Sequence, residues 1–564
     1  MDNQRILLWA ALGFLLLQVW TSWQLDYGPR PAPVADNPVA VTGGSDTTAS
    51  INQEGSAVGR EDLPTPVVGA RNRTAETSNL PSQSDQIEQK GQTITVTTDT
   101  LRVEIGSVGG DINSASLLLY PTSLQTPDDP FVLLSNREDQ YFVAQSGLQS
   151  VNADAPSHHA EFSIEKTEYF LADGQDEIRV PLTWTSESGL TVTKTFIFQR
   201  DRYLIDLEYD IKNTTGASVN LNQYRQLRRK PVTDDETQSF IYTFIGGVVS
   251  TAEDAYTKID FDDFSDITNT RQTPGGWAAI IEHYFASAWI PHQDETSTIY
   301  TKALSSPQRY IIGLQSEAIE VADGASALIS TSLFVGPKIQ ERMREIAPHL
   351  DLTVDYGFLS VIAKPIFWLL GKIHSIVGNW GWAIVGVTMC IKLLFYKLSE
   401  ASYRSMARMR KLQPQLASLK ERYGDDRAKM GQATMDLYKK EKVNPLGGCL
   451  PIMVQIPVFI SLYWVLLESV ELRQAPWILW IEDLSLMDKY YVLPVIMGIT
   501  MFIQQKLNPA PVDPIQAKVF MFMPLIFTIF FAFFPAGLVL YWVVNNTLSI
   551  AQQYYITRHV LAEK

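Results

Sequence analysis

The pattern of apolar and polar positions divides the chain into four parts. The first is an apolar run, Ile6–Val19, which is followed by Trp20 and Trp23, residues typical of a membrane interface. No Ala-x-Ala cleavage pattern follows at residues 24–31, so a retained transmembrane anchor at residues 1–26 is favoured over a cleaved signal peptide.

A polar part and an alternating part come next. Residues 27–91 are rich in Pro, Ser, Thr, Gly, Asn and Gln, which predicts a flexible tether because little apolar surface can be buried. From residue 92 apolar and polar positions alternate, as in Tyr203, Ile205, Leu207, Tyr209 and Ile211 against Asp206, Glu208 and Asp210. This period indicates strands with one buried face. Residues 92–350 are therefore expected to form a large β-sandwich that ends in a helix near Lys338–His349.

Long apolar runs form the last part and predict a polytopic helical core. Five candidates for transmembrane helices are Trp380–Leu398, Leu450–Leu467, Tyr490–Ile503, Val519–Phe534 and Leu538–Ile556. With the anchor they make six spans. The predicted fold class is therefore multi-domain, with a polytopic α-helical membrane core and an all-β domain.

The segment before the second span is more polar. Phe358–Val377 carries Lys364, Pro365, Lys372 and His374 among its apolar residues. It is too polar to span and amphipathic enough to lie along the outer interface. We assign residues 351–379 to this interfacial helix and residues 380–399 to the second span.

Charge predicts the orientation of the chain. Residues 401–443 contain eleven Lys and Arg against five Asp and Glu, and short basic loops stay in the cytoplasm. The loop 468–489 has five acids against two basic residues, which suits the opposite side. Both termini are then cytoplasmic and residues 27–379 are exported. The predicted location is the inner membrane of a bacterium, with the β-domain in the periplasm.

The cytoplasmic loop, residues 400–443, has the pattern of a helical hairpin. Gly424 can end its first helix, Asp425 or Asp426 can cap its second, and Pro414 should kink or restart the first. Six of its basic residues form a candidate docking surface for lipid head groups or ribosomal RNA: Arg404, Arg408, Arg410, Lys411, Lys420 and Arg422. An ordinary positive-inside loop is the alternative.

Lys392 is the most informative residue of the membrane half. It follows Trp380 by twelve residues, about 18 Å along a helix, and so lies in the inner half of the hydrocarbon. A charge at the bilayer centre costs about 2.5–3.5 kcal/mol, so the side chain should face protein or water unless it snorkels beside Lys397. Other polar residues interrupt the same runs: Thr388, Gln455, Asn545, Asn546 and Thr547. Together these residues predict a hydrated cavity.

Two spans are short. Tyr490–Ile503 has fourteen residues and Val519–Phe534 has sixteen, about 24 Å against a hydrocarbon core of roughly 30 Å. Short spans thin the bilayer, and a basic wet pocket beside thin lipid lowers the barrier for a polar chain end. This favours machinery that handles other polypeptides. A transporter would show repeated halves with interrupted helices, and the sequence has no internal repeat.

Composition excludes most catalytic classes. The 564-residue chain has a net charge of -15, which argues against nucleic-acid binding through bulk positive charge, and only two cysteines. It has neither an HExxH pair nor a GxxxxGK[ST] loop. We expect no catalytic residue, no cofactor and no metal.

The exported half holds two weak candidates for chemistry. Glu282 and His283 have further ionisable residues nearby in sequence: Asp234, Asp235, Asp254 and His292. They could form an acid–base set, but solvated surface is favoured because strands place polar residues outward. The pair His158 and His159 is expected in an exposed loop rather than a metal site, since adjacent strand residues point to opposite faces.

Four longer motifs lie in the membrane half: KVNPLGGC at 442–449, QIPVF at 455–459, SVELRQAP at 469–476 and FPAGLVLYW at 534–542. They resemble the motifs of the YidC/Oxa/Alb family of membrane protein insertases, over residues 356–558. The plan of anchor, tether and large exported domain is similar to the Gram-negative form of that family, which extends the resemblance to the whole chain.

The resemblance implies a β-supersandwich in the periplasm and a five-helix core whose groove opens to cytoplasm and lipid, with residues 444–564 supplying four of the spans. The partners it implies are nascent inner-membrane proteins, the Sec translocon with its accessory subunits, the translating ribosome, the signal recognition particle system and the lipid bilayer. The family's groove arginine falls on Lys392, its groove threonine on Thr388, and an aromatic contact position on Trp542. Lysine keeps the charge of arginine but not its planar fork.

The expected function is that of an insertase and chaperone that inserts, folds and assembles inner-membrane proteins, alone or with Sec, without covalent chemistry. Lys392 would attract acidic or polar substrate ends, and Trp542 would offer a slide for the incoming helix. The groove would be kept wet by Thr388, Gln455, Asn545 and Asn546. The alternatives are a transporter with Lys392 as substrate site and a tethered carbohydrate-active enzyme.

Overall fold

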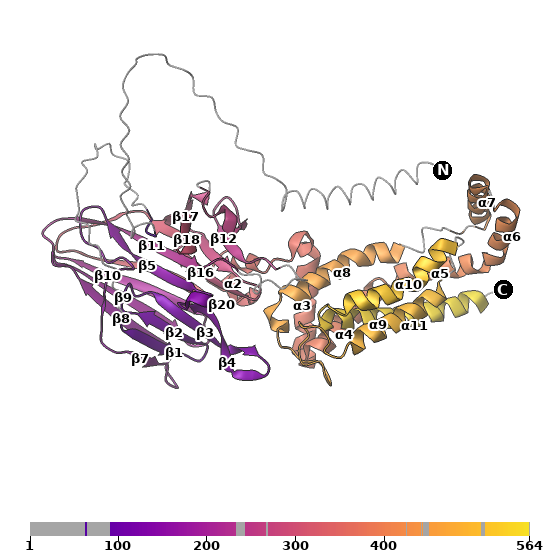
Figure 1. Cartoon of the computed structure of the whole chain (residues 1–564), viewed down its shortest axis with the longest axis horizontal. Coiled ribbons are helices and arrows are strands. Elements are labelled where there is room, and N and C mark those ends of the chain that lie inside the picture. The colour runs from indigo at the N-terminus through magenta and orange to yellow at the C-terminus, as the bar shows by residue number, and fades with distance from the viewer. Residues whose placement is uncertain are drawn as a thin grey trace, which may run out of the picture. The chain divides into compact units, whose positions relative to one another are not determined.

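The structure is a computed structural model that describes residues 62–64, 91–232, 243–266, 269–424, 426–441, 443, 450–508 and 514–562. The chain forms two units, Met1–Val58 and Gly59–Lys564, and the first lies outside the described residues. The predicted anchor at residues 1–26 therefore stays a prediction. In the second unit an all-β domain comes first and a group of helices follows (Figure 1).

The β-domain consists of two sheets. The 11-stranded sheet has the order β14-β17-β18-β11-β5-β4-β3-β2-β1-β7, with β19 paired to β11. Its strands are β1 (Thr93–Thr97), β2 (Leu101–Gly106), β3 (Ile112–Ser123), β4 (Thr126–Ser135), β5 (Phe142–Ser150), β7 (Glu168–Phe170), β11 (Val219–Arg229), β14 (Arg271–Pro274), β17 (Thr296–Ser305), β18 (Gln308–Ser316) and β19 (Ile319–Val321).

The second sheet is 9-stranded, with the order β13-β12-β15-β16-β20-β10-β9-β8-β6. Its strands are β6 (Ser163–Ile164), β8 (Glu177–Thr185), β9 (Leu190–Gln199), β10 (Leu204–Asn213), β12 (Gly246–Ser250), β13 (Thr257–Ile259), β15 (Trp277–Ile281), β16 (Phe285–Pro291) and β20 (Ser326–Pro337). The predicted all-β domain is confirmed.

Strand β10 shows how the alternating pattern builds this domain. Its residues Ile205, Leu207, Tyr209 and Ile211 are buried, while the acidic residues between them are partly or fully exposed. The strand runs antiparallel to both β9 and β20. Each successive strand thus adds its row of buried apolar side chains to one shared core. The short helix α2 (Gln340–Ile346) follows β20, inside the predicted helical stretch.

Helix α3 (Ser360–Val377) begins the helical part. It buries Ala363, Ile366 and Leu370, which follow three- and four-residue spacing, and leaves its other faces more exposed. Within the described residues, Gly357–Val377 is the helix that has the length and composition to cross a membrane. The interfacial position predicted for it stays a prediction.

The predicted second span is broken by a bend. Helix α4 (Trp380–Leu394) is followed by Phe395, where the chain bends. The axis of the next helix, α5 (Tyr396–Lys411), makes an angle of 67° with that of α4. The bend falls inside the predicted span Trp380–Leu398, and the assignment of this segment as a span stays a prediction. An apolar run reveals where a helix is stable but carries no information on its direction after a break.

Four further helices complete the part that includes the predicted spans: α8 (Leu450–Glu468), α9 (Val492–Leu507), α10 (Pro514–Phe531) and α11 (Ala536–Ala562). Three apolar stretches in them, Met453–Glu468, Val492–Leu507 and Lys518–Phe531, are shorter than a standard span. Buried residues of α3, α4 and α8 to α11 form one apolar cluster, so these helices pack as one core. The number of six spans stays a prediction.

The predicted helical hairpin is present as helices α6 (Gln413–Tyr423) and α7 (Arg427–Lys440), and its cytoplasmic location stays a prediction. Pro414 lies in the first turn of α6, directly after the end of α5, which confirms the predicted restart. Gly424 follows α6, and the side chain of Asp426 caps α7 by accepting a hydrogen bond from the Lys429 amide at 3.1 Å.

Candidate functional site: a polar cavity in the helical core

Helices α5, α8, α9, α10 and α11 enclose a cavity of about 450 Å³, which we call the groove cavity. Its polar lining includes Gln455, Gln504, Gln505, Asn508, Asn545, Asn546 and Ser549. Its apolar lining includes Met406, Ile456, Phe459, Met501, Phe520 and Phe527. The cavity is therefore lined by both polar and apolar side chains, which can contact both parts of one amphipathic chain.

Helix α11 supplies the longest polar stripe of the groove cavity. Tyr541, Asn545 and Ser549 are spaced four residues apart and lie on one face. Asn545 accepts a hydrogen bond from Gln455 Nε2 of α8, and the same nitrogen lies 3.5 Å from the Tyr541 hydroxyl. Asn546 Nδ2 lies 3.4 Å from Thr500 Oγ1 of α9. These amides tie three helices together around the cavity.

Lys392 reaches the groove cavity through another residue. Its Nζ donates a hydrogen bond to Ser549 Oγ at 2.7 Å, and Ser549 in turn donates to the Asn545 carbonyl at 2.7 Å. Lys392 itself lines a much smaller space, which it shares with Gln455. Because Gln455 and Ser549 also line the groove cavity, the ammonium group lies directly behind its wall.

Trp542 and Thr388 differ in their placement. The Trp542 ring lines the groove cavity and packs edge-on against Phe459, with ring centroids 5.0 Å apart. Its indole N–H is buried and has no hydrogen-bond partner among the residues that the structure describes. Thr388 is buried within the helical core, and its hydroxyl donates to the Ile384 carbonyl of its own helix at 2.7 Å. Thr388 does not line either cavity.

The structure thus brings four of the six predicted groove residues to the cavity wall, places Lys392 behind it and keeps Thr388 away. Sequence reasoning missed Ser549, although its spacing from Asn545 was a usable signal. It also missed Gln504, Gln505 and Asn508. These follow the predicted span Tyr490–Ile503, and the longer helix α9 carries them to the cavity.

The predicted docking residues lie on α5 and α6. Arg408, Arg410, Lys411, Lys420 and Arg422 are exposed, whereas Arg404 is partly buried and pairs with Glu400 at 3.0 Å. A surface of this composition can bind anionic groups.

Glu282 and His283, the central pair of the candidate acid–base set, are engaged in separate contacts. Glu282 pairs with Arg229 at 3.1 Å, and His283 Nε2 lies 2.8 Å from the Leu467 carbonyl of α8. Burial, aided by the charge of Lys338, lowers the pKa of His283 to about 3. Both side chains are partly buried in structural contacts, so the prediction of solvated surface is wrong for them. Asp234 and Asp235 lie outside the described residues.

The histidine pair also departs from the prediction. His158 is buried, with 3% of its surface exposed, and His159 is exposed. Both imidazoles face Asp62, so the expectation of an exposed loop is wrong for His158. In the part of the chain that the structure describes, these three residues are the only group that could hold a metal, with ligand atoms within 4.8 Å of one another.

Comparison with known proteins places the chain in a family. The membrane protein insertase YidC of Thioalkalivibrio sulfidiphilus is 50% identical, over 99% of both chains. The insertase YidC of Nitrosococcus oceani is also 50% identical, over 100% of both chains. The chain belongs to the YidC family. The resemblance inferred from the four motifs is confirmed.

The family models divide this YidC chain in two. The model described as YidC periplasmic domain matches residues 93–369, and the model described as 60Kd inner membrane protein matches residues 372–563. The second segment contains the whole lining of the groove cavity. A comparison of structures matches this chain to a crystal structure of an active YidC insertase with its first transmembrane domain resolved. The match covers 83% of this chain and 95% of that chain, at 18% sequence identity and a TM-score of 0.37.

Proposed function

We propose that this chain inserts membrane proteins into the bacterial inner membrane and assists their folding and assembly there, and that the groove cavity receives the polar part of the substrate. The family assignment supports insertion, and its named relatives are insertases rather than enzymes. The observation that carries the role of the cavity is the hydrogen bond from Lys392 to Ser549, a residue that lines the cavity together with the amides.

The mixed lining of the groove cavity suits the two parts of an inserting chain. The lining amides and the half-buried cation of Lys392 offer hydrogen bonds and charge to a polar or acidic chain end, which is costly to place in lipid. Helix α10 lines the cavity with Phe520, Pro524 and Phe527, among others. The opposite face of the same helix exposes Met521, Phe522, Leu525, Ile526 and Ile529. An apolar segment of the substrate would leave the cavity beside α10 and enter the bilayer.

The driving force in this proposal is partition of the substrate itself. Burial of each CH₂ group contributes about 0.8 kcal/mol, so an apolar segment of some twenty residues supplies far more than the cost of moving a short polar end. No nucleotide chemistry is required of the protein. Its role is to lower the barrier.

Partners and orientation follow as further parts of the proposal. The exposed basic residues of α5 and α6 would dock on the translating ribosome or on anionic lipid, with both chain termini in the cytoplasm. The Sec translocon and the signal recognition particle system would deliver other substrates. Binding of ribosome–nascent chain complexes should then fall as salt rises, because phosphate contacts release counterions.

Reconstitution tests the proposed function. Purified protein in liposomes is given a substrate with one or two spans, and insertion is measured by protection of the translocated segment from protease. Protection should depend on the protein and be reduced by Lys392→Ala. The matched control is Lys397→Ala, which removes a lysine whose side chain is 92% exposed. Equal protection in empty liposomes would contradict the proposal. Solute flux without protection would favour the transporter.

A further inference from the structure

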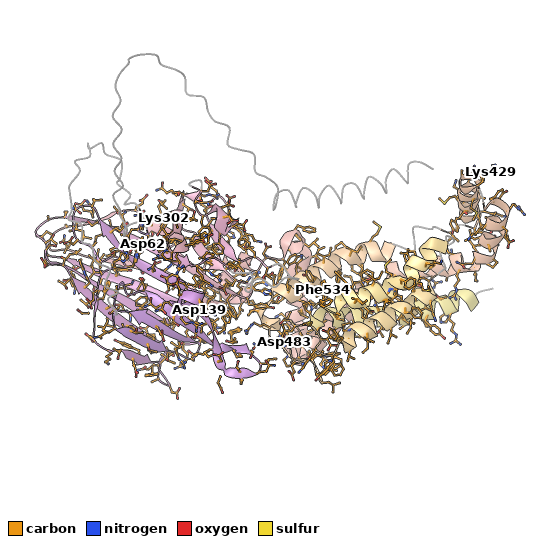
Figure 2. All side chains as sticks on the ribbon, viewed as in Figure 1. Asp62, Asp139, Lys302, Lys429, Asp483 and Phe534 are labelled. Atoms are coloured by element: carbon orange, nitrogen blue, oxygen red, sulfur yellow. The ribbon has the colours of Figure 1, made fainter. Side chains whose placement is uncertain are left out.

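Three residues of the predicted tether lie against the β-domain. Asp62 and Pro64 are buried and Leu63 is half-buried, although the sequence around them predicted a flexible segment. They contact the 11-stranded sheet near β5, β11 and β17, where Asp62 and Lys302 are labelled in Figure 2. The tether therefore has one specific point of contact with the domain it precedes.

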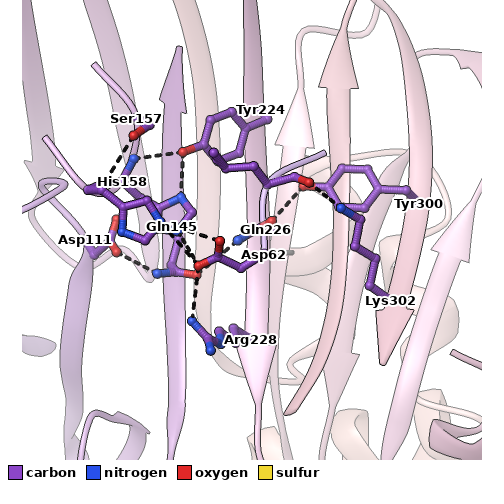
Figure 3. Close-up of polar contacts among 12 residues, drawn as sticks. Asp62, Asp111, Gln145, Ser157, His158, Tyr224, Gln226, Arg228, Tyr300 and Lys302 are labelled. Atoms are coloured by element: carbon purple, nitrogen blue, oxygen red, sulfur yellow. Dashed lines mark hydrogen bonds and ion pairs between the residues drawn. The ribbon is translucent and has the colours of Figure 1, made fainter. Parts of the chain in front are cut away.

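The carboxylate of Asp62 lies in a cationic pocket. Its Oδ2 lies 3.0 Å from His158 Nε2, 3.3 Å from His159 Nε2 and 3.5 Å from Arg228 Nη1 (Figure 3). Burial alone would raise the pKa of Asp62, but hydrogen bonds from the two histidines hold it below its usual range. The pocket is thus built for an ionised carboxylate.

The backbone of the next two residues is recognised as well. Lys302 Nζ donates a hydrogen bond to the Leu63 carbonyl, and Gln149 Nε2 donates to the Pro64 carbonyl at 3.1 Å. One carboxylate and two consecutive carbonyls are therefore matched by donors. A chance contact of a flexible segment would rarely satisfy three successive residues.

The pocket is supported from behind. The Tyr224 hydroxyl accepts from the His158 amide at 2.8 Å and lies 2.6 Å from His158 Nδ1, which directs Nε2 towards Asp62. Gln149 is held by Gln315 Nε2 at 3.2 Å. A chain of bonds from Asp111 through Gln145 and Gln226 to Tyr300 fixes the neighbouring strands (Figure 3). The donors are thus held in place by the sheet itself, not only by the segment that they bind.

We propose that this pocket is a binding site for a short peptide segment with an acidic residue, and that its resident ligand is the Asp62-Leu63-Pro64 segment of the same chain. Docking shortens the connection between the predicted anchor and the β-domain. Residues 27–61 can extend over at most about 120 Å, whereas residues 27–92 could extend over about 220 Å. The contact thereby restricts how far the domain can move from the anchor.

An ion-pair site is favoured over a metal site. Arg228 carries a fixed positive charge 3.5 Å from the same Asp62 oxygen that faces both histidines. A divalent cation bound there would be repelled by the guanidinium group, whereas a carboxylate is attracted by it. A metal chelator should therefore leave the docked segment in place.

The test uses thiol protection in the full-length protein with both native cysteines replaced by serine. Pro64→Cys places a thiol at a buried position and keeps the backbone carbonyl. Labelling by a maleimide should be slow. It should become at least tenfold faster when Asp62→Asn, Arg228→Gln or His158→Gln is added. Glu54→Gln, which removes another tether carboxylate, is the matched control and should leave the rate slow.

Two outcomes would overturn the proposal. One is an unchanged labelling rate after Asp62→Asn in a protein with unaltered circular dichroism. The other is a rate that rises with EDTA and falls again with Zn²⁺, which would assign the site to a metal. If Pro64→Cys itself releases the segment, a nitroxide at Thr65→Cys decides instead. Its mobility should increase on Asp62→Asn, and equal mobility in both proteins would refute docking.

Discussion

Lys392 on α4 and Ser549 on α11 are 157 residues apart in sequence and joined by a hydrogen bond of 2.7 Å. The bond gives the ammonium group a neutral acceptor inside the helical core. It also connects the charge to Asn545, because Ser549 donates to the Asn545 carbonyl. Lys392 is therefore held towards the groove cavity, which weakens the alternative that its side chain snorkels to the cytoplasmic interface.

Ser549→Ala should weaken both stability and insertion. It removes an acceptor from a charged donor, an interaction of about 1.5–3 kcal/mol, and frees the lysine to move away from the cavity. Thermal unfolding and protease protection measure the two effects. Thr547→Ala is the control, because the Thr547 side chain is exposed and its hydroxyl bonds only to the Val543 carbonyl of its own helix. Equal loss in both variants would contradict a specific role for Ser549.

Substitutions of Lys392 should separate charge from packing. Lys392→Arg should retain insertion, and Lys392→Ala should lose it most severely for substrates whose translocated ends carry Asp or Glu. Lys392→Glu should fail with acidic tails and recover in part when the tail is made basic, because attraction then has the opposite sign. Protease protection at matched protein levels is the measurement. Full insertion of acidic-tailed substrates by the Ala variant would exclude the electrostatic role.

The sequence predicted the parts of this molecule that depend on local pattern. The alternation in Tyr203–Ile211 was sufficient for strand β10, and the polar residues Asn545 and Asn546 of α11 do line a cavity. The start of a new helix at Pro414 could also be predicted from the local sequence, since proline lacks the amide N–H that a helix interior needs.

The features that the sequence did not predict depend on contacts between helices or strands that are far apart in the sequence. The partner of Lys392 is set by the register between α4 and α11, which no periodicity of either helix reveals. Thr388 was expected at the cavity because it lies one turn from Lys392, but its side chain packs into the core instead. His158 was predicted to be exposed because its own segment gives no sign of its partner. That partner is Asp62, which lies 96 positions earlier in the sequence.

Trp542 allows a test of how the cavity wall is built. Trp542→Phe should retain the stability of the wild type within about 1 kcal/mol, since a ring still packs on Phe459 and a buried N–H without a partner is removed. Trp542→Ala should lose about 3–5 kcal/mol. Thermal unfolding in detergent would show the difference. A large loss for Trp542→Phe would mean that the indole N–H makes an essential bond.

Glu471 lies in the 3₁₀ turn Val470–Leu472, between α8 and α9, and its two neighbours in that turn are buried. Burial, with a smaller contribution from the charge of Glu341, raises the pKa of Glu471 to about 7. The folded protein therefore holds this proton more tightly than the unfolded chain does. Burial is the main cause that raises the pKa of Tyr120 and of Tyr356, and the charge of an ionised Glu471 would in turn help to raise them.

Stability should consequently fall as pH rises from the ordinary pKa of a glutamate, about 4.5, to about 7, where Glu471 ionises in the folded state. Glu471→Gln removes this dependence. We expect the variant to match the wild type near pH 4.5 and to exceed it by about 2 kcal/mol at pH 8, less than the full shift implies because solvent reaches the side chain. Thermal unfolding at the two pH values measures the difference. Glu341→Gln should reproduce only a small part of it, since burial is the larger cause. A variant whose advantage is the same at both pH values would show that Glu471 stays ionised in the folded protein.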